Sequence, residues 1–120
     1  MSSEISNPQH HRVDYLELPA TDLATTRRFY GSVFGWTFED YGPDYMSFDD
    51  GRLQGGFTRD SKVVAGGALV ILYSNGLEAT RERVREAGGR IVQDIFSFPG
   101  GRRFHFADPN GNELAVWSKP

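Results

Sequence analysis

The chain has 120 residues, of which 38% are hydrophobic and 24% are charged, and its formal net charge is -3. This length supports one domain with its own core, because two separately folding halves would each bury too little surface. Acidic and basic residues are interspersed, so no basic field is available for nucleic acid or an anionic membrane surface. No apolar run approaches the ~18 residues that cross a bilayer, and the absence of cysteine favours a cytoplasmic location.

The N-terminal half predicts a strand, a helix and three further strands. Residues 1–11 are polar and aperiodic, so we expect a flexible arm ahead of a single domain at 12–118. Alternating side chains predict a strand at 13–20, and apolar residues at helical spacing predict a helix at 23–34. Short strands are then expected around residues 36–39, 45–48 and 53–57, separated by turns rich in Gly, Pro and Asp. Module one, residues 12–58, therefore has the expected order β-α-β-β-β.

The C-terminal half predicts the same order again. After a linker near residues 58–66, an apolar run predicts a strand at 67–73. Asn75 and Glu78 have the spacing of a capping box for the next helix, which Gly88-Gly89 ends. Strands are expected at 90–98 and on both sides of an Asp-Pro-Asn-Gly-Asn turn at 108–112. Module two, residues 67–118, therefore also reads β-α-β-β-β.

The two modules differ in length at one place. Asp22-Leu23 matches Gly76-Leu77 54 residues later, whereas the turn glycines Gly51 and Gly111 are 60 residues apart. The difference of six residues must lie in module two before its final hairpin. We therefore expect the strand at 90–98 to be longer than its counterpart in module one.

Two motifs occur in a fixed order in this repeated unit, the run from Arg28 to Trp36 (Arg-Phe-Tyr-Gly-Ser-Val-Phe-Gly-Trp) and the run from Phe106 to Asn112. Together they resemble the vicinal oxygen chelate superfamily, which contains glyoxalase I, bleomycin-resistance proteins and extradiol dioxygenases. The resemblance covers residues 12–118 and implies an α+β fold of two tandem β-α-β-β-β modules. Their eight strands would form a curved sheet with two outer helices and a ligand in its concave cup. It also implies a homodimer.

The same resemblance bears on metal binding. Metal-dependent members place ligands on the first and last strands of each module, and the matching positions here are Tyr15, Gly55, Leu69 and Ala115. None of these side chains is the imidazole or carboxylate that a divalent metal prefers. We therefore expect the usual metal site to be lost and no cofactor to be needed. A two-residue slip in this matching leaves one alternative open, a displaced metal site formed by Glu17, Glu113 and His105, with Ile71 nearby.

Strand alternation selects the remaining candidate site residues. If Leu16 and Leu18 face the helix, Tyr15 and Glu17 face the cup. A carboxylate in an apolar cup can act as a general base, which makes Glu17 a catalytic candidate, and His105 is the second. The expected ligand-binding residues are Tyr15, Glu17, Phe48, Gln54, Leu69, Ile71, Ala115 and Trp117.

Three functions follow as hypotheses. The first is a metal-independent protein that binds a small, partly apolar molecule in the cup. The second is a metal-dependent glyoxalase-like lyase or isomerase with a displaced site, and the third is an assembly module without a ligand. An enclosed aromatic pocket without convergent ionisable groups favours the first hypothesis, and a carboxylate meeting His105 inside the pocket favours the second. A cup filled by its own aromatic side chains favours the third.

Overall fold

The computed structural model describes residues 10–64 and 66–120, so residues 1–9 of the expected arm lie outside the described residues. Module one contains β1 (Tyr15–Pro19), α2 (Leu23–Phe34), β2 (Thr37–Asp40), β3 (Tyr45–Asp49) and β4 (Gln54–Thr58). Module two contains β5 (Val70–Tyr73), α3 (Leu77–Glu86), β6 (Arg90–Phe98), β7 (Gly101–Ala107) and β8 (Glu113–Ser118). Within these residues, neither helix is long and apolar enough to cross a membrane.

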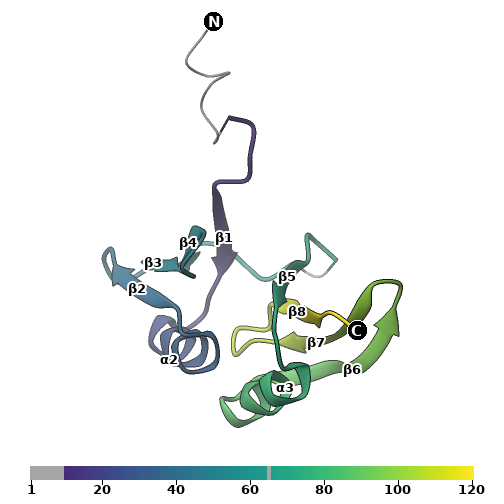
Figure 1. Ribbon diagram of the computed structural model, residues 1–120. Coiled ribbons are helices and arrows are strands. Elements are labelled where there is room, and N and C mark those ends of the chain that lie inside the picture. The colour runs from purple at the N-terminus through teal and green to yellow at the C-terminus, as the bar shows by residue number, and fades with distance from the viewer. Residues whose placement is uncertain (1–9, 65) are drawn as a thin grey trace, which may run out of the picture.

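Each module forms one mixed sheet of four strands, in the orders β1-β4-β3-β2 and β5-β8-β7-β6. The first and last strands of each module pair in parallel, and the other neighbours are antiparallel. Figure 1 shows both helices on the same side of the sheets, next to each other. The predicted α+β architecture is therefore confirmed, with its eight strands divided between two sheets. We call the face of each sheet away from its helix the cup face.

Helix α2 has the bounds that the sequence predicts. Asp22 caps it by accepting a hydrogen bond from the backbone N–H of Thr25 at 3.1 Å, which is the role that short acidic side chains commonly play at helix starts. This hydrogen bond is the main reason that the pKa of Asp22 lies below its usual value. The helix ends at Gly35, whose φ of 74° is easily adopted only without a side chain.

Module two corrects one expectation and confirms another. The capping box expected from Asn75 and Glu78 is wrong, because α3 begins after Gly76 without a side-chain cap. Instead, the Ser74 hydroxyl accepts a hydrogen bond from the Gly76 N–H at 3.0 Å and organises this turn. The extra residues lie where predicted, since β6 has nine residues and β2 has four. Two register shifts bend β6 against β7.

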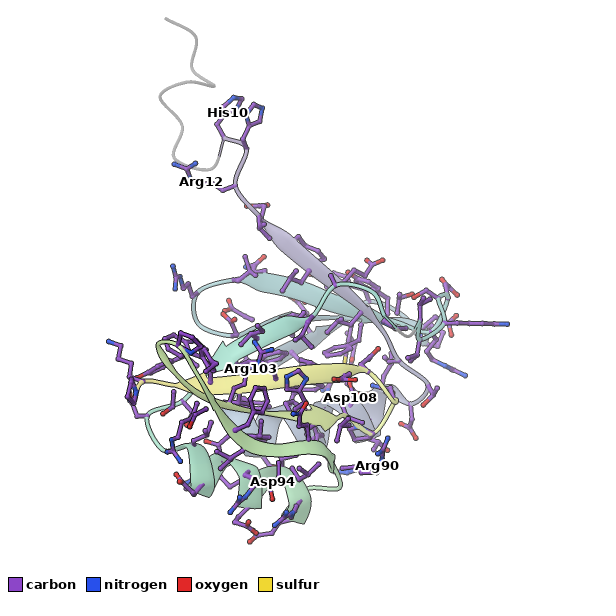
Figure 2. All side chains as sticks on the ribbon, turned by 90° about the vertical axis from the view of Figure 1, so that its right-hand side faces the viewer. His10, Arg12, Arg90, Asp94, Arg103 and Asp108 are labelled. Carbon is purple, nitrogen blue, oxygen red and sulfur yellow. The ribbon has the colours of Figure 1, made fainter. Side chains whose placement is uncertain are left out.

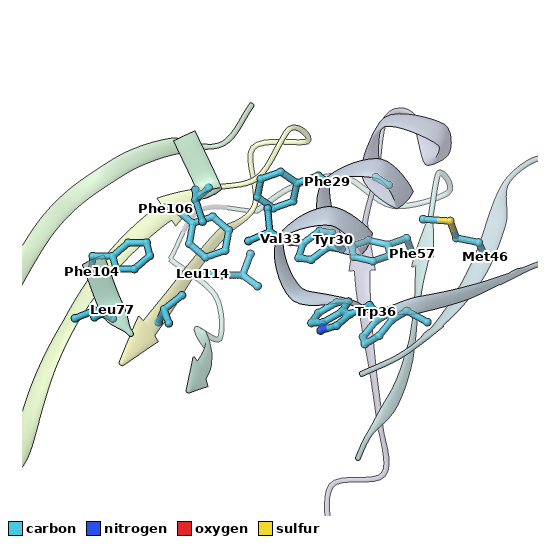
Figure 3. Close-up of a cluster of buried hydrophobic side chains, with 14 residues drawn as sticks. Phe29, Tyr30, Val33, Trp36, Met46, Phe57, Leu77, Phe104, Phe106 and Leu114 are labelled. Atoms are coloured by element: carbon cyan, nitrogen blue, oxygen red, sulfur yellow. The ribbon is translucent and has the colours of Figure 1, made fainter. Parts of the chain in front are cut away.

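The two modules share one hydrophobic core. Phe29 and Val33 project from α2 toward Phe106 on β7, and the Phe29 and Phe106 ring centroids are 6.0 Å apart (Figure 3). On the other side of α2, Trp36 stacks between Tyr30 at 4.6 Å and Phe48 at 4.4 Å. One helix thus packs on strands of both modules, and neither module buries its apolar face alone.

The Asp-Pro-Asn-Gly-Asn turn after β7 joins the modules by polar contacts. The buried Tyr30 hydroxyl donates to Asp108 Oδ2 at 2.9 Å, and the pKa of Tyr30 is raised, mainly by burial. Asn112 Nδ2 donates to the carbonyl of Pro19 at 2.7 Å, and Asn110 Oδ1 accepts from the Thr21 N–H at 2.8 Å. The turn therefore holds module two against the start of α2. In this chain the second motif of the resemblance has a structural role.

Candidate functional site

Strand alternation separates the cup face of module one from its core face. Leu16 and Leu18 pack against the core, which leaves Tyr15 and Glu17 on the cup face. On β3 the side chains of Met46 and Phe48 are 0% and 2% exposed and belong to the core. The alternate residues of β3, namely Tyr45, Ser47 and Asp49, consequently face the cup.

A pocket of about 560 Å³ lies on this cup face. It falls within the size range of small-molecule sites, which runs from roughly 300 to 1,000 Å³. Its walls come from β1, β2, β3 and the start of β4. The lining side chains used below are Tyr15, Glu39, Tyr41, Tyr45, Asp49 and Gln54.

Two phenols and a carboxylate meet at the edge of this pocket. The hydroxyls of Tyr15 and Tyr45 form a hydrogen bond with each other. The pKa of Tyr45 is raised, first by burial and then by hydrogen bonding to Tyr15 and Glu17. The phenols fit because Gly56 lies beneath them, where a Cβ would come within 2.0 Å of the Tyr45 hydroxyl oxygen. The result is a hydrogen-bonding surface of two phenols beside a carboxylate at one side of the pocket.

The pairing of β1 with β4 corrects the expected metal positions by one residue. Leu16 pairs with Gly55, and in module two Val70 pairs with Leu114. The counterpart of Ala115 is therefore Gly56 and not Gly55, which points into the core toward Phe48. This correction does not affect the expectation about metal binding, since neither glycine has a side-chain atom that could bind a metal ion. The four positions of the family's metal site still lack imidazole and carboxylate.

A second hollow, of about 550 Å³, lies at the seam between β1 and β5. It is lined by Glu17, Leu69 and Glu113 and by the linker that precedes β5. Ile71, two residues after Leu69, is 45% exposed. The expected ligand-binding residues are thus distributed over two hollows, with Tyr15 and Gln54 in the first and Glu17 and Leu69 in the second.

The cup face of module two is filled by its own side chains. The guanidinium of Arg103 lies over the rings of Phe96 and Phe98, at 5.3 and 5.6 Å from their centroids. Figure 2 shows Arg103 on the side of β7 away from α3. Trp117 packs edge-on against Tyr73 at 5.1 Å, so it contributes to this packing and to neither hollow. The pocket of about 560 Å³ therefore lies on the cup face of module one.

His105 pairs with Glu113 on module two. Its Nδ1 lies 2.8 Å from Glu113 Oε2, and the residue is 9% exposed. Its Nε2 is buried and has no hydrogen-bond partner among the residues that the structure describes. A carboxylate on one ring nitrogen fixes the orientation of an imidazole. The structure therefore brings together one carboxylate and His105, the arrangement that the enzyme hypothesis requires, but on the filled cup face.

The displaced metal site is not assembled in the described parts of the chain. Across residues 10–64 and 66–120, no three His, Asp or Glu side chains come together as a group able to hold a metal ion. Glu17 and Glu113 both line the seam hollow, and Glu17 is exposed. The carboxylate that His105 contacts is that of Glu113.

Several residues that line the open pocket were not predicted from the sequence, and two predicted site residues, Phe48 and Ala115, are buried. Tyr41, Tyr45, Glu39 and Asp49 line the pocket but were not among the expected site residues. A signal for Tyr45 and Asp49 was available, because they alternate with the buried residues of β3. Phe48 borders the pocket, yet it is stacked on Trp36 in the core, and Ala115 is 0% exposed.

Comparison with known proteins agrees with the fold. The family model described as "Glyoxalase/Bleomycin resistance protein/Dioxygenase superfamily" matches residues 12–116. A "Glyoxylase-like domain-containing protein" of Didymella fabae is 29% identical over 92% of this chain and 96% of its own length. The anthracycline biosynthesis protein DauV of Streptomyces sp. (strain C5) is 30% identical over 88% of this chain. The alignment spans 46% of the length of DauV.

Among solved structures, a glyoxalase/bleomycin resistance protein/dioxygenase family enzyme from Burkholderia phytofirmans PsJN superimposes with a TM-score of 0.78. Its sequence identity is 16%, and the match covers 90% of this chain and 100% of that one. Such an identity supports the fold alone. The family match over nearly the whole chain goes further, and the protein belongs to the glyoxalase/bleomycin resistance/dioxygenase superfamily.

Proposed function

We propose that this protein binds a small, partly apolar molecule on the cup face of module one without the help of a divalent metal. The observation that carries the proposal is the open, tyrosine-lined pocket of about 560 Å³. Aromatic walls supply apolar contact, while phenol and amide groups supply directed hydrogen bonds. Tyr15, Tyr45 and Gln54 offer both kinds of contact from three different strands.

Metal independence is supported by the chemistry of the side chains. The four positions that hold the metal in metal-dependent relatives carry Tyr15, Gly56, Leu69 and Ala115 in this chain. A phenol, an alkyl group and two residues without donor atoms do not fit a divalent cation. No step that uses a metal is therefore assigned to this protein.

One relative suggests the kind of ligand. DauV is named as an anthracycline biosynthesis protein, and the region similar to this chain makes up 46% of it. A flat polycyclic molecule suits a pocket with the rings of Tyr15, Tyr41 and Tyr45 in its walls, because aromatic faces stack and meet edge to face. The proposed role of the protein is to sequester or process such a compound in the cytoplasm.

A glyoxalase-like lyase or isomerase remains the second candidate function, and the His105–Glu113 pair favours it. Glu113 would orient the imidazole, so that Nε2 could accept a proton once a substrate reached it.

We also propose a homodimer, because Ile71 and Tyr73 are 45% and 47% exposed on the cup face of module two. Contact with a second copy of this chain in a dimer would bury these side chains. The oligomeric state can be measured by sedimentation.

The test of the binding function has two arms. Chelator-treated protein is titrated with Zn²⁺, Ni²⁺, Mn²⁺ and Fe²⁺ while the melting temperature is followed, and we expect no saturable shift. A library of aromatic small molecules is then screened in the same assay, and hits are measured by calorimetry. We expect hits that raise the melting temperature and bind at 1:1 stoichiometry. A stoichiometric metal site would contradict the metal-free proposal, and a complete absence of hits would contradict the pocket.

A further inference from the structure

The cup face of module one carries charge of one sign. The charged side chains that line its pocket, among the residues that the structure describes, are Glu39 and Asp49. Glu17 lies on the same face of β1, next to Tyr45. Pairing partners confirm the common face, since Thr37 is opposite Asp49 and Glu39 is opposite Ser47. The alternate positions of all four strands of this sheet include no lysine, arginine or histidine on the cup face.

In the described parts of the chain, no ion pair balances the charge of these three carboxylates. Within the described residues, Glu17, Glu39 and Asp49 form no ion pair, although Asp40 and Asp44 of the same module pair with arginines. In module two, Glu78 is likewise paired with Arg102, at 2.7 Å. Glu39 accepts a hydrogen bond from the Tyr41 hydroxyl at 3.1 Å, which orients its carboxylate but leaves its charge unbalanced.

The same pocket has aromatic rings in its walls. Tyr15, Tyr41 and Tyr45 come from β1, the β2–β3 turn and β3, and all three line the hollow. The face of an aromatic ring attracts an ammonium group, most strongly where water is excluded. Carboxylates at the rim add a Coulombic attraction for the same ligand. Rings and carboxylates therefore favour the same kind of ligand, independently of each other.

We propose that the module-one pocket selects a cationic ligand, an amine or quaternary ammonium attached to a flat apolar body. This inference rests on the proposed binding function and specifies its ligand class. The apolar body would lie against the tyrosine rings, and the cation would lie near Glu39 and Asp49. The pocket discriminates against carboxylates and phosphates, which would meet uncompensated negative charge.

Three probes that share a naphthylmethyl group test the charge preference. They are (2-naphthylmethyl)trimethylammonium, the neutral analogue in which carbon replaces the nitrogen, and anionic 2-naphthylacetate, each titrated by calorimetry at low salt. We expect the cation to bind about tenfold more tightly than the neutral probe, and the anion to bind most weakly. We also expect the affinity for the cation alone to fall when salt is added.

Charge-neutral variants locate the effect. Glu39→Gln and Asp49→Asn should each lower the affinity for the cationic probe by about three- to tenfold. The affinity for the neutral probe should stay within about twofold of the wild-type value. The matched control is Asp60→Asn, which removes one charge from the same module outside the pocket lining and should change neither.

The outcomes separate this inference from the proposed function. Equal binding of cation and neutral probe, or preference for the anion, would overturn the charge preference and leave the pocket intact. Equal weakening by Asp60→Asn would show that net charge alone attracts the cation, which also overturns the inference. Failure of all three probes to bind would overturn the pocket together with the inference that rests on it.

Discussion

Gly55 and Gly56 are neighbours on β4, and replacing each by alanine should give opposite results. A Cβ on Gly55 would lie 2.3 Å from the backbone oxygen of Leu16 and 2.3 Å from the ring of Phe48. Backbone cannot rotate away, so β1 and β4 must separate where Leu16 pairs with Gly55. Overpacking of this kind costs about 1–3 kcal/mol. We expect Gly55→Ala to lose about 2–3 kcal/mol of unfolding free energy and roughly 8–12 °C in Tm.

A Cβ on Gly56 meets the side chains of Tyr45 and Tyr15 instead, at 2.0 Å and 2.8 Å from their hydroxyl oxygens. Both side chains can swing toward solvent, so we expect Gly56→Ala to cost less than about 1 kcal/mol. It should nevertheless abolish the hydrogen bond between the phenols and weaken ligand binding at least tenfold.

Urea unfolding followed by far-ultraviolet circular dichroism measures stability, and calorimetry with the naphthyl cation measures binding. Wild-type protein and the two variants are compared under identical conditions. Equal destabilisation by both substitutions, or a larger loss for Gly56→Ala, would refute the assignment of Gly55 to the core and of Gly56 to the cup face.

Three further predictions concern stability. Tyr30→Phe removes a donor to the buried Asp108 carboxylate and should cost about 1.5–3 kcal/mol by urea unfolding, and an unchanged midpoint would contradict this role. Asn110→Ala removes the acceptor for the backbone at the start of α2 and should cost about 1 kcal/mol in the same assay. The Arg102 guanidinium lowers the pKa of Glu78 from 4.5 to about 2. This pair therefore stabilises the fold above about pH 4.5, and its contribution is lost as the pH falls toward the lower pKa. The Tm of Glu78→Gln should depend less on pH over this range, and parallel curves would count against the pair.

The fold could be predicted from the sequence to a large extent. Helix α2 and strand β6 have the predicted bounds, because apolar spacing, a capping aspartate and terminal glycines all act locally. The prediction that the strand at 90–98 is longer than its counterpart in module one was correct, since β6 has nine residues and β2 has four. The start of α3 was wrong, because a capping-box spacing does not ensure that the side chains adopt the capping geometry.

The candidate site was predicted less well. Tyr15 and Gln54 were predicted to bind the ligand and do line the pocket, and alternation along β1 placed Glu17 on the cup face. Tyr45 was missed, because its position depends on pairing between strands and on the space above Gly56. The position assigned to Gly55 was one residue off, and a slip of one residue exchanges the faces of a strand.

Sequence alone determined the repeated β-α-β-β-β order, the family and the unsuitability of the metal positions. These follow from local spacing and from the identity of single residues, which need no knowledge of distant contacts. Tertiary structure decided that module one has the open cup face and that Arg103, Phe96, Phe98 and Trp117 fill the other. It also decided that His105 pairs with Glu113. Whether a cup face is open or filled depends on side chains from several strands at once, and only packing fixes their relative positions.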